Sequence, residues 1–239
     1  MRIVAVIPAR MGSSRFPGKP LAPLGGRTML EHVYRGTAGC AQLDEVIVAT
    51  CDAEIHDAAV AFGATVALTA ATHVRACDRV AEVSAREAAG IVVMVQGDEP
   101  MVTPGMVSAA IDGLLAAPGV ACVNLMTPID DERELHDPNT IKVVTSASRR
   151  ALYFSRAAIP SRAAAGVMQK QVCVMAFHRD ALTRFPALAP GPLERLEAID
   201  MLRFLEHDVP VGMVPTSVRT HAVDSPADLA HVSRLMGFA

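Results

Sequence analysis

Three basic side chains, Arg10, Arg15 and Lys19, follow closely after an apolar run at residues 3–7. The run is typical of a buried parallel strand, and the loop after such a first strand lies at the edge where open α/β sheets bind ligands. The small residues at 12–14 let the backbone approach a ligand and offer N–H and hydroxyl donors. We expect this loop to hold a polyphosphate. The simpler alternative is an ordinary basic loop between a strand and a helix.

Two aspartates stand where a metal ion could be held against that phosphate. Asp98 comes shortly after another apolar run, at 91–95, and Asp224 precedes a Ser-Pro pair near the end of the chain. Because Mg²⁺ binds a few carboxylates together with phosphate oxygens, this pair predicts a magnesium site. The alternative for each aspartate is structural, as the N-cap of the helix that follows it.

These residues are positioned by apolar runs that alternate with helical patterns over the first 126 residues. Such alternation is typical of right-handed βαβ units, so we predict an α/β fold with a mostly parallel sheet in a single domain, 1–239. Thr28 and Glu31 form a capping-box pattern, and Asp52 is the expected N-cap of the second helix. Strands are expected at 3–7, 45–50, 65–68, 91–95 and 120–126, and helices at 28–39, 52–62, 79–89 and 104–116.

The pattern changes at residues 128–178. Turn-rich stretches accompany runs at 141–144 and 171–177 that alternate like antiparallel strands. We interpret this segment as a small antiparallel β-arm or lobe, which either covers the acceptor site or forms a dimer contact. The α/β pattern then returns with a helix at 192–206, a strand at 209–213 and a helix from 226.

Composition and missing motifs exclude several classes of protein. The net charge of −3 and the lack of tryptophan argue against a general nucleic-acid binder. The sequence has neither the P-loop pattern nor the GxGxxG pattern of dinucleotide-binding proteins. Five scattered cysteines without a CxxC pair fit a reducing compartment and argue against a structural zinc site. With no signal-peptide pattern and no apolar run of ~18 residues, we expect a cytoplasmic protein without a membrane partner.

Nine short stretches span nearly the whole chain: IPAR at 7–10, SRFPGKP at 14–20, VQGDEP at 95–100, DPN at 137–139, KVV at 142–144, ALYFSR at 151–156, IP at 159–160, PLE at 192–194 and VDSP at 223–226. Together and in this order they are highly specific, and the chain resembles the CMP-Kdo synthetase family, the 3-deoxy-manno-octulosonate cytidylyltransferases. The resemblance implies a Rossmann-like nucleotidyltransferase fold and a homodimer with the β-arm at its interface. It also implies an enzyme that uses CTP and Mg²⁺, in which an oxygen of an anionic acceptor attacks the α-phosphorus and pyrophosphate leaves.

The resemblance assigns roles to individual residues. Arg10, Lys19 and Asp98 are catalytic in this assignment, Gln96 lies near the cytosine and ribose, and Asp98 and Asp224 hold the metal. These roles agree with the demands of phosphoryl transfer, which are mainly positioning and charge neutralisation. The residues assigned to the nucleotide or the acceptor are Ala9, Arg15, His73, Arg75, Arg79, Gln96, Arg156, Gln171, Glu194, Met201 and His221.

The acceptor half of the family pattern is changed in this chain. A family stretch with Ser-Gly-Thr after its histidine reads HVRACDR at 73–79. Gln171 and Cys173 stand where the family has a histidine and a glycine, and Met201 stands where it has a glutamine. Groups that could hydrogen-bond a polyhydroxylated sugar are thus lost, and a site built for sugar hydroxyls is sensitive to such losses.

Cations are gained in the same half of the pattern, at Arg75, Arg219 and His221. Added positive charge suits a compact dianion, so we expect a small phosphonate, such as phosphonoformate, as the acceptor. The alternative is 3-deoxy-manno-octulosonate (Kdo) or a related acidic sugar such as 8-amino-Kdo, with the changes being neutral and the arginines solvated. A nucleotide-binding protein without turnover is the alternative of another class, and the retained loop cations and aspartates argue against it.

Overall fold

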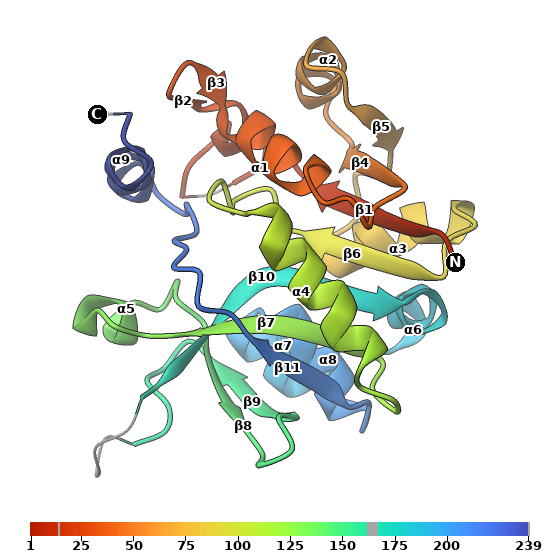
Figure 1. Ribbon diagram of the computed structural model, residues 1–239, viewed down its shortest axis with the longest axis vertical. Coiled ribbons are helices and arrows are strands. Elements are labelled where there is room, and N and C mark those ends of the chain that lie inside the picture. The colour runs from red at the N-terminus through yellow and green to blue at the C-terminus, as the bar shows by residue number, and fades with distance from the viewer. Residues whose placement is uncertain (14, 162–166, 239) are drawn as a thin grey trace.

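A nine-stranded sheet crosses the centre of the protein in the computed structural model, which describes residues 1–13, 15–161 and 167–238 (Figure 1). Residue 14 of the basic loop and residues 162–166 of the predicted lobe lie outside the described residues. The main strands, in their order across the sheet, are β11 (Val211–Pro215), β7 (Cys122–Pro128), β10 (Gln169–His178), β6 (Ile91–Val95), β1 (Ile3–Pro8), β4 (Glu45–Thr50) and β5 (Thr65–Leu68).

Four neighbouring strands, β6, β1, β4 and β5, form the parallel half of the sheet. They arise from the predicted runs at 3–7, 45–50, 65–68 and 91–95, so this part of the prediction is confirmed. Strands β1, β4 and β6 are almost entirely buried, as expected for parallel strands that are covered on both faces. Because β1 and β6 pair directly, their carboxyl ends bring the basic loop beside the residues that follow β6.

Strand β10 lies in the middle of the sheet, which corrects the predicted lobe at 128–178. It pairs antiparallel with β6 on one side and with β7 on the other, so the last part of that segment belongs to the main sheet. The earlier part branches away, because β8 (Lys142–Thr145) pairs with the start of β10 and with β9 (Ala151–Ser155). The expected α/β fold with a mostly parallel sheet and a small antiparallel arm is confirmed, and the arm consists of β8, β9 and the start of β10.

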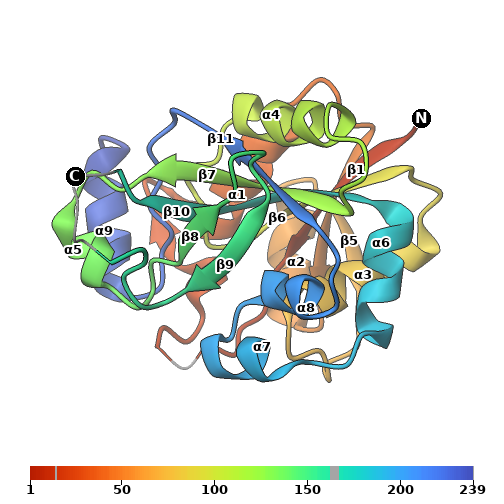
Figure 2. The ribbon, with the colours of Figure 1, turned by 90° about the horizontal axis from the view of Figure 1, so that it is seen from below.

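Helices cover both faces of the sheet (Figure 2). On one face α1, α2 and α4 pack through a cluster that includes Leu30, Ile55 and Met106, and on the other α3, α6 and α8 pack through Val80 and Leu182 among others. Among the described residues, no helix is both long enough and apolar enough to cross a bilayer. The helices are α1 (Met29–Ala38), α2 (Ala53–Ala61), α3 (Ala76–Arg86), α4 (Pro104–Leu115), α5 (Glu132–His136), α6 (Arg179–Arg184), α7 (Pro192–Glu197), α8 (Asp200–Glu206) and α9 (Pro226–Leu235).

Local side-chain and backbone geometry decides where helices begin and end. The Thr28 hydroxyl accepts a hydrogen bond from the backbone N–H of Glu31 at 3.2 Å, which confirms the predicted N-cap, while the Glu31 carboxylate pairs with Arg35 at 2.7 Å. The predicted helix at 192–206 is two helices. Ala198 adopts the left-handed conformation with a φ of 57°, which ends α7 and turns the chain before α8 begins.

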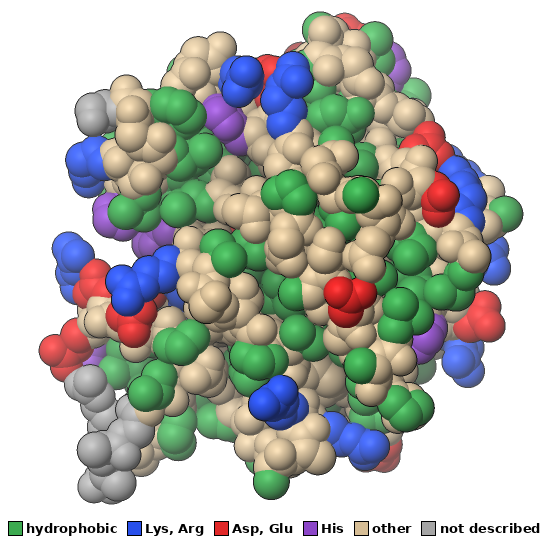
Figure 3. Space-filling model, in the orientation of Figure 1, with side chains coloured by type: hydrophobic (Ala, Val, Ile, Leu, Met, Phe, Trp, Pro, Cys, Tyr) green, Lys and Arg blue, Asp and Glu red, His purple; other side chains and the backbone are tan. Residues whose placement is uncertain are grey.

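The last helix, α9, returns to the beginning of the chain. Its Val232 packs with Leu24 and Met29, and Val223 of the preceding segment joins the same cluster. Leu24 belongs to the hairpin of β2 (Pro23–Leu24) and β3 (Arg27–Thr28), so the segment before α9 is held near the basic loop. In Figure 3 a hollow of about 520 Å³ separates α9 from α5 at the left edge of the molecule.

Candidate active site

Asp52 stabilises the conformation of the basic loop after β1. The Asp52 carboxylate accepts a hydrogen bond from the backbone N–H of Met11 at 2.7 Å, which corrects its predicted use as a side-chain cap of α2. The Met11 carbonyl in turn accepts from the N–H groups of Ser13 (2.9 Å) and Gly18 (3.2 Å). The Ser13 and Gly18 N–H groups are therefore used inside the loop.

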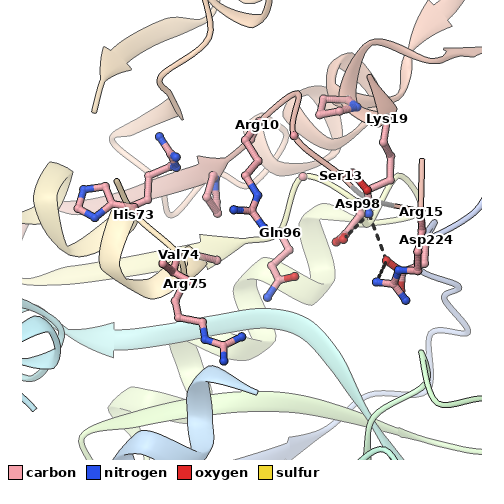
Figure 4. Close-up of a pocket in the computed structure, with 17 residues that line it drawn as sticks. Arg10, Ser13, Arg15, Lys19, His73, Val74, Arg75, Gln96, Asp98 and Asp224 are labelled. Carbon is pink, nitrogen blue, oxygen red and sulfur yellow. Dashed lines mark hydrogen bonds and ion pairs between the residues drawn. The ribbon is translucent and has the colours of Figure 1, made fainter. Parts of the chain in front are cut away.

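This loop forms one wall of a cleft of about 260 Å³ (Figure 4). The other walls come from the carboxyl end of β6, the start of α3 and the segment before α9. The structure therefore brings together the residues predicted for the nucleotide and the metal. Ten predicted site residues line the cleft: Ala9, Arg10, Arg15, Lys19, His73, Arg75, Arg79, Gln96, Asp98 and Asp224.

Lys19 lies at the centre of a cluster of opposite charges in this cleft. Its ammonium donates to Asp98 Oδ2 at 2.9 Å, to the Val223 carbonyl at 2.7 Å and to Asp224 Oδ1 at 3.3 Å. Arg15 donates to the same Asp224 oxygen at 2.9 Å. Burial alone would lower the pKa of Lys19, but the negative charges of Asp98 and Asp224 outweigh it and hold that pKa above its ordinary value. Lys19 therefore keeps its proton and its positive charge.

Other residues cap the helices that follow Asp98 and Asp224. Thr103 accepts the capping hydrogen bond of α4, and Ser225 caps α9 in a reciprocal box with Asp228. The structural alternative considered for the two aspartates is therefore wrong, and both carboxylates line the cleft. Asp98 Oδ1 is buried and has no hydrogen-bond partner among the described residues.

The remaining cationic side chains of the cleft differ in how firmly they are held. Arg10 is exposed, extends toward the side of the cleft where Gln96 lies (Figure 4), and makes no hydrogen bond or ion pair with any described residue. Arg79 is buried and donates to the Thr69 hydroxyl, so it supports the wall from inside. His73 is hydrogen-bonded to the Glu82 carboxylate at 2.5 Å. Arg10 is thus the cation that is most available to a ligand.

A smaller cavity of about 50 Å³ lies beside the cleft, and Asp224 lines both. Two predicted acceptor residues, Gln171 and His221, line this second cavity. The amide nitrogen of Asn124 donates to two backbone carbonyls at 2.7 and 2.9 Å, so its amide oxygen is the atom that faces Gln171. The Gln171 nitrogen donates to that oxygen. Gln171 Oε1 is left buried and without a partner among the described residues.

Three of the residues predicted to bind the nucleotide or the acceptor line neither cavity. Glu194 is 1% exposed and its carboxylate lies between two arginine side chains. Met201 has no exposed surface and packs from α8 into the core. Arg156 donates to two backbone carbonyls at 2.6 and 2.7 Å and so ties loops together. For Glu194 and Met201, which are buried, the assignment as direct ligand contacts is corrected to structural support, while the assignment of Arg156 stays a prediction.

The cations gained in the acceptor half of the sequence are paired with carboxylates. Arg75 pairs with Glu194 at 3.2 Å, and the exposed Arg219 pairs with Asp130 at 3.0 Å. His221 lies between two carboxylates, at 3.2 and 3.4 Å. Because these charges are neutralised within the protein, they no longer argue for a compact dianionic acceptor.

Sequence reasoning missed three carboxylates that support the site. Asp52 fixes the basic loop, and Asp228 accepts from the backbone N–H groups of Asp224 (3.1 Å) and Ser225 (2.8 Å). Glu99 is buried beside the second cavity. Its carboxylate accepts a hydrogen bond of 3.0 Å from the backbone N–H of Cys173, which lies at a bulge in β10. Burial raises the pKa of Glu99. The spacing of Asp228 three residues after Ser225 is a capping-box signal, whereas no sequence pattern identifies the partners of Asp52 or Glu99.

Comparison with known proteins identifies the family of this chain. A family described as cytidylyltransferase matches residues 4–211. A 3-deoxy-manno-octulosonate cytidylyltransferase of Solibacter usitatus (strain Ellin6076) is 44% identical over 237 residues, which cover 98% of this chain and 94% of that protein. One of Syntrophotalea carbinolica (strain DSM 2380 / NBRC 103641 / GraBd1) is 43% identical over 244 residues, covering 97% of each.

Solved structures show the same similarity in three dimensions. The structure of a CMP:2-keto-3-deoxy-manno-octonic acid synthetase complexed with CTP matches with a TM-score of 0.91 and 36% identity, over 99% of this chain and 98% of that chain. A 4-diphosphocytidyl-2C-methyl-D-erythritol synthase from Anaerococcus prevotii DSM 20548 matches with a TM-score of 0.66, 16% identity and coverage of 98% and 96%, and shares the fold alone. The nucleotidyltransferase fold expected from the sequence is confirmed.

Proposed function

Because the chain belongs to the CMP-Kdo synthetase family of cytidylyltransferases, we propose that it transfers CMP from CTP to 3-deoxy-manno-octulosonate, with release of pyrophosphate. The main support for Kdo as the acceptor is the similarity over nearly the whole chain to relatives that are named as 3-deoxy-manno-octulosonate cytidylyltransferases. The phosphonate acceptor that the sequence suggested loses its physical basis, since the added cations already have carboxylate partners.

Gln171 Oε1, which has no hydrogen-bond partner within the described part of the chain, supports a hydroxylated acceptor. A buried polar atom without a partner costs about 1–3 kcal/mol, and an incoming donor recovers that cost. A sugar hydroxyl is such a donor, whereas a fully ionised phosphonate has no hydrogen to donate. Because Asp224 lines both cavities, an acceptor in contact with Gln171 lies next to the cleft that is proposed for the nucleotide.

The loop cations are proposed to hold the triphosphate. Arg10 has no hydrogen-bond or ion-pair partner among the described residues, and Lys19 and Arg15 line the same cleft. The oxygen of an acceptor hydroxyl bonds to the α-phosphorus, and the hydroxyl proton passes to water. The bond from that phosphorus to the bridging oxygen of pyrophosphate breaks, and pyrophosphate leaves with the electron pair. Fixed positive charge beside the leaving phosphates stabilises this transition state and needs no rearrangement during the reaction.

Mg²⁺ is proposed as the metal, and Asp98 and Asp224 would hold it. The donor set fits, since both groups are carboxylates in one cleft and Asp98 Oδ1 is a buried oxygen without a partner among the described residues. When bound there, the ion would neutralise charge on the triphosphate.

A homodimer is also proposed, on the resemblance to the family. Leu152 of β9 and Leu196 of α7 expose apolar surface, with 61% and 82% of each residue accessible. A hydrogen bond of 2.8 Å from Ser155 to Glu197 joins β9 to the end of α7, so the elements that carry the two leucines are neighbours. Exposed apolar side chains at such a region suit a subunit interface. Light scattering on the purified protein tests the oligomeric state.

The acceptor is tested by pyrophosphate release from CTP and Mg²⁺ with Kdo and with phosphonoformate as competing acceptors. We expect the higher kcat/KM with Kdo, and isolation of CMP-Kdo as the product. A higher kcat/KM with phosphonoformate would overturn the assignment of Kdo as the acceptor. Binding of CTP without release of pyrophosphate in the presence of either acceptor would overturn the proposal that the protein is an active transferase.

The metal assignment is tested by Asp98→Asn, with Asp112→Asn as the matched control. Asp112 bonds Gln42 on the surface of α4, away from the cleft. We expect Asp98→Asn to lower kcat by about 100-fold or more, because it removes a charged metal ligand, and Asp112→Asn to leave it unchanged. A normal kcat for Asp98→Asn in Mg²⁺ would contradict the assignment.

A further inference from the structure

The Lys19 ammonium has all three of its hydrogens committed to the proposed metal site. Its acceptors are Asp98 Oδ2, Asp224 Oδ1 and the Val223 carbonyl between them, and its side chain is only 12% exposed. Arg15 lies on the same oxygen of Asp224. The two positive charges of the loop thus balance the two negative charges of the aspartates, and the group as a whole carries no net charge.

This arrangement conflicts with a divalent cation on the same carboxylates. Mg²⁺ requires its oxygen ligands at about 2.0–2.1 Å, and it is repelled by a second cation that shares those oxygens. The ammonium lies 2.9 and 3.3 Å from one oxygen of each aspartate, so it occupies the position between them. Asp98 Oδ1 remains unpaired among the described residues, and one buried oxygen alone does not hold a hydrated Mg²⁺ tightly.

We propose that Lys19 and a divalent cation compete for Asp98 and Asp224, and that the metal binds tightly only when a triphosphate draws the Lys19 ammonium away. The inference rests on the proposed function for the identity of the triphosphate and the metal. Phosphate oxygens give Lys19 and Arg15 new acceptors, which returns net negative charge to the aspartates. By linkage, the nucleotide and the metal then raise each other's affinity.

Titration of the enzyme with Mn²⁺ alone, without any nucleotide, tests the competition. Bound Mn²⁺ is measured from the loss of the electron paramagnetic resonance signal of the free ion. We expect Lys19→Met to bind Mn²⁺ at least about tenfold more tightly than the wild type, and Lys19→Arg to bind it as weakly as the wild type. Arg10→Met is the matched control, because it removes the same charge from the same cleft without releasing an aspartate oxygen.

The wild-type protein offers a second measurement that needs no variant. The chain has three lysines, and Lys142 and Lys170 are buried and serve as internal references. We expect saturating Mn²⁺ to increase the rate at which an amine-acylating reagent modifies Lys19, read by mass spectrometry, without changing the rate at the other two lysines.

Three results would overturn the inference: equal Mn²⁺ affinity of Lys19→Met and the wild type, an equal gain in Arg10→Met, or an acylation rate of Lys19 that Mn²⁺ does not change. Because neither measurement uses CTP or an acceptor, the competition can fail while pyrophosphate release from CTP and Kdo succeeds. The reverse is also possible, so the two proposals are tested separately.

Discussion

Single side chains of the cleft divide into those held by the protein and those left to a ligand. Arg10 belongs to the second group, because it contacts no described residue through a hydrogen bond or ion pair. We expect Arg10→Met to raise the KM for CTP by about tenfold while leaving the melting temperature unchanged. Arg35→Met is the control, since Arg35 is exposed and pairs with Glu31 on α1, and neither residue lines the cleft. A fall in melting temperature with an unchanged KM would show that Arg10 is structural.

The sequence carried the identity of the cleft residues but not their pairing. Asp98 and Asp224 could be separated from helix caps, because Thr103 and Ser225 stand at better capping positions in the sequence itself. The sequence could not show whether Arg75 is free or paired with a carboxylate. Its partner Glu194 lies 119 positions away, and a count of charges contains no information on which of them meet after folding.

At the level of elements, a strand pattern fixes the strand but not its neighbours. The alternation at 171–177 predicts a strand, and β10 contains it, yet the same alternation fits an arm or the middle of a mixed sheet. The break between α7 and α8 was missed for a related reason. Ala198 is a good helix former, so its own propensity gives no sign of the left-handed conformation that it adopts.

The junction of α3, α7 and α8 depends on a buried ionic cluster. Glu194 meets Arg203 at 2.6 Å and Arg75 at 3.2 Å, and it is almost fully buried. We expect Glu194→Gln to lower the free energy of unfolding by about 3 kcal/mol, since it leaves two arginines without their shared charge partner. The control Glu31→Gln breaks a pair with the half-exposed Arg35 and should cost less than about 1 kcal/mol. Urea unfolding measures both, and equal losses would contradict the role of the cluster.

His221 joins α5 to α9 and gives this contact a pH dependence. Hydrogen bonding to Glu134 raises the pKa of His221; burial opposes that effect, and Asp228 adds to it. Lys170 lowers this pKa, and the ring of His231 packs against His221. Because the folded pKa lies above the unfolded value, the stabilisation is complete below the ordinary pKa of 6.5 and is lost as the pH rises through the folded pKa.

We therefore expect His221→Gln to lower the free energy of unfolding at pH 6 and to have a smaller effect at pH 8.5. Urea unfolding at the two pH values measures the difference between variant and wild type. His56→Gln is the control, since His56 is more exposed than His221 and neighbours the exposed Asp57. A difference for His221→Gln that is the same at both pH values would contradict a charged His221 in the folded protein.

Considered as a whole, the molecule builds its cleft from segments far apart in the chain. The loop after β1, the start of α3, the end of β6 and the segment before α9 each contribute a wall. The sequence predicted the first and third walls from strand ends, because the carboxyl ends of parallel strands share one edge. It gave no physical reason to expect Asp224 beside Lys19, which follows from the packing of Val223 and Val232 against Leu24.

A ligand that bridges these walls should stabilise the whole fold. At 100 times its dissociation constant, a ligand that binds only the folded state adds about 2.7 kcal/mol, and for a domain of this size that corresponds to a rise in melting temperature of about 5–10 °C. We expect CTP with Mg²⁺ to produce such a shift by differential scanning calorimetry, and ATP at the same concentration to produce a much smaller one. Since Gln96 is the residue expected near the cytosine, Gln96→Ala should reduce the difference between the two nucleotides. Equal shifts with CTP and ATP would show that the cleft binds triphosphate without reading the base, and would move the origin of cytidine selectivity away from the end of β6.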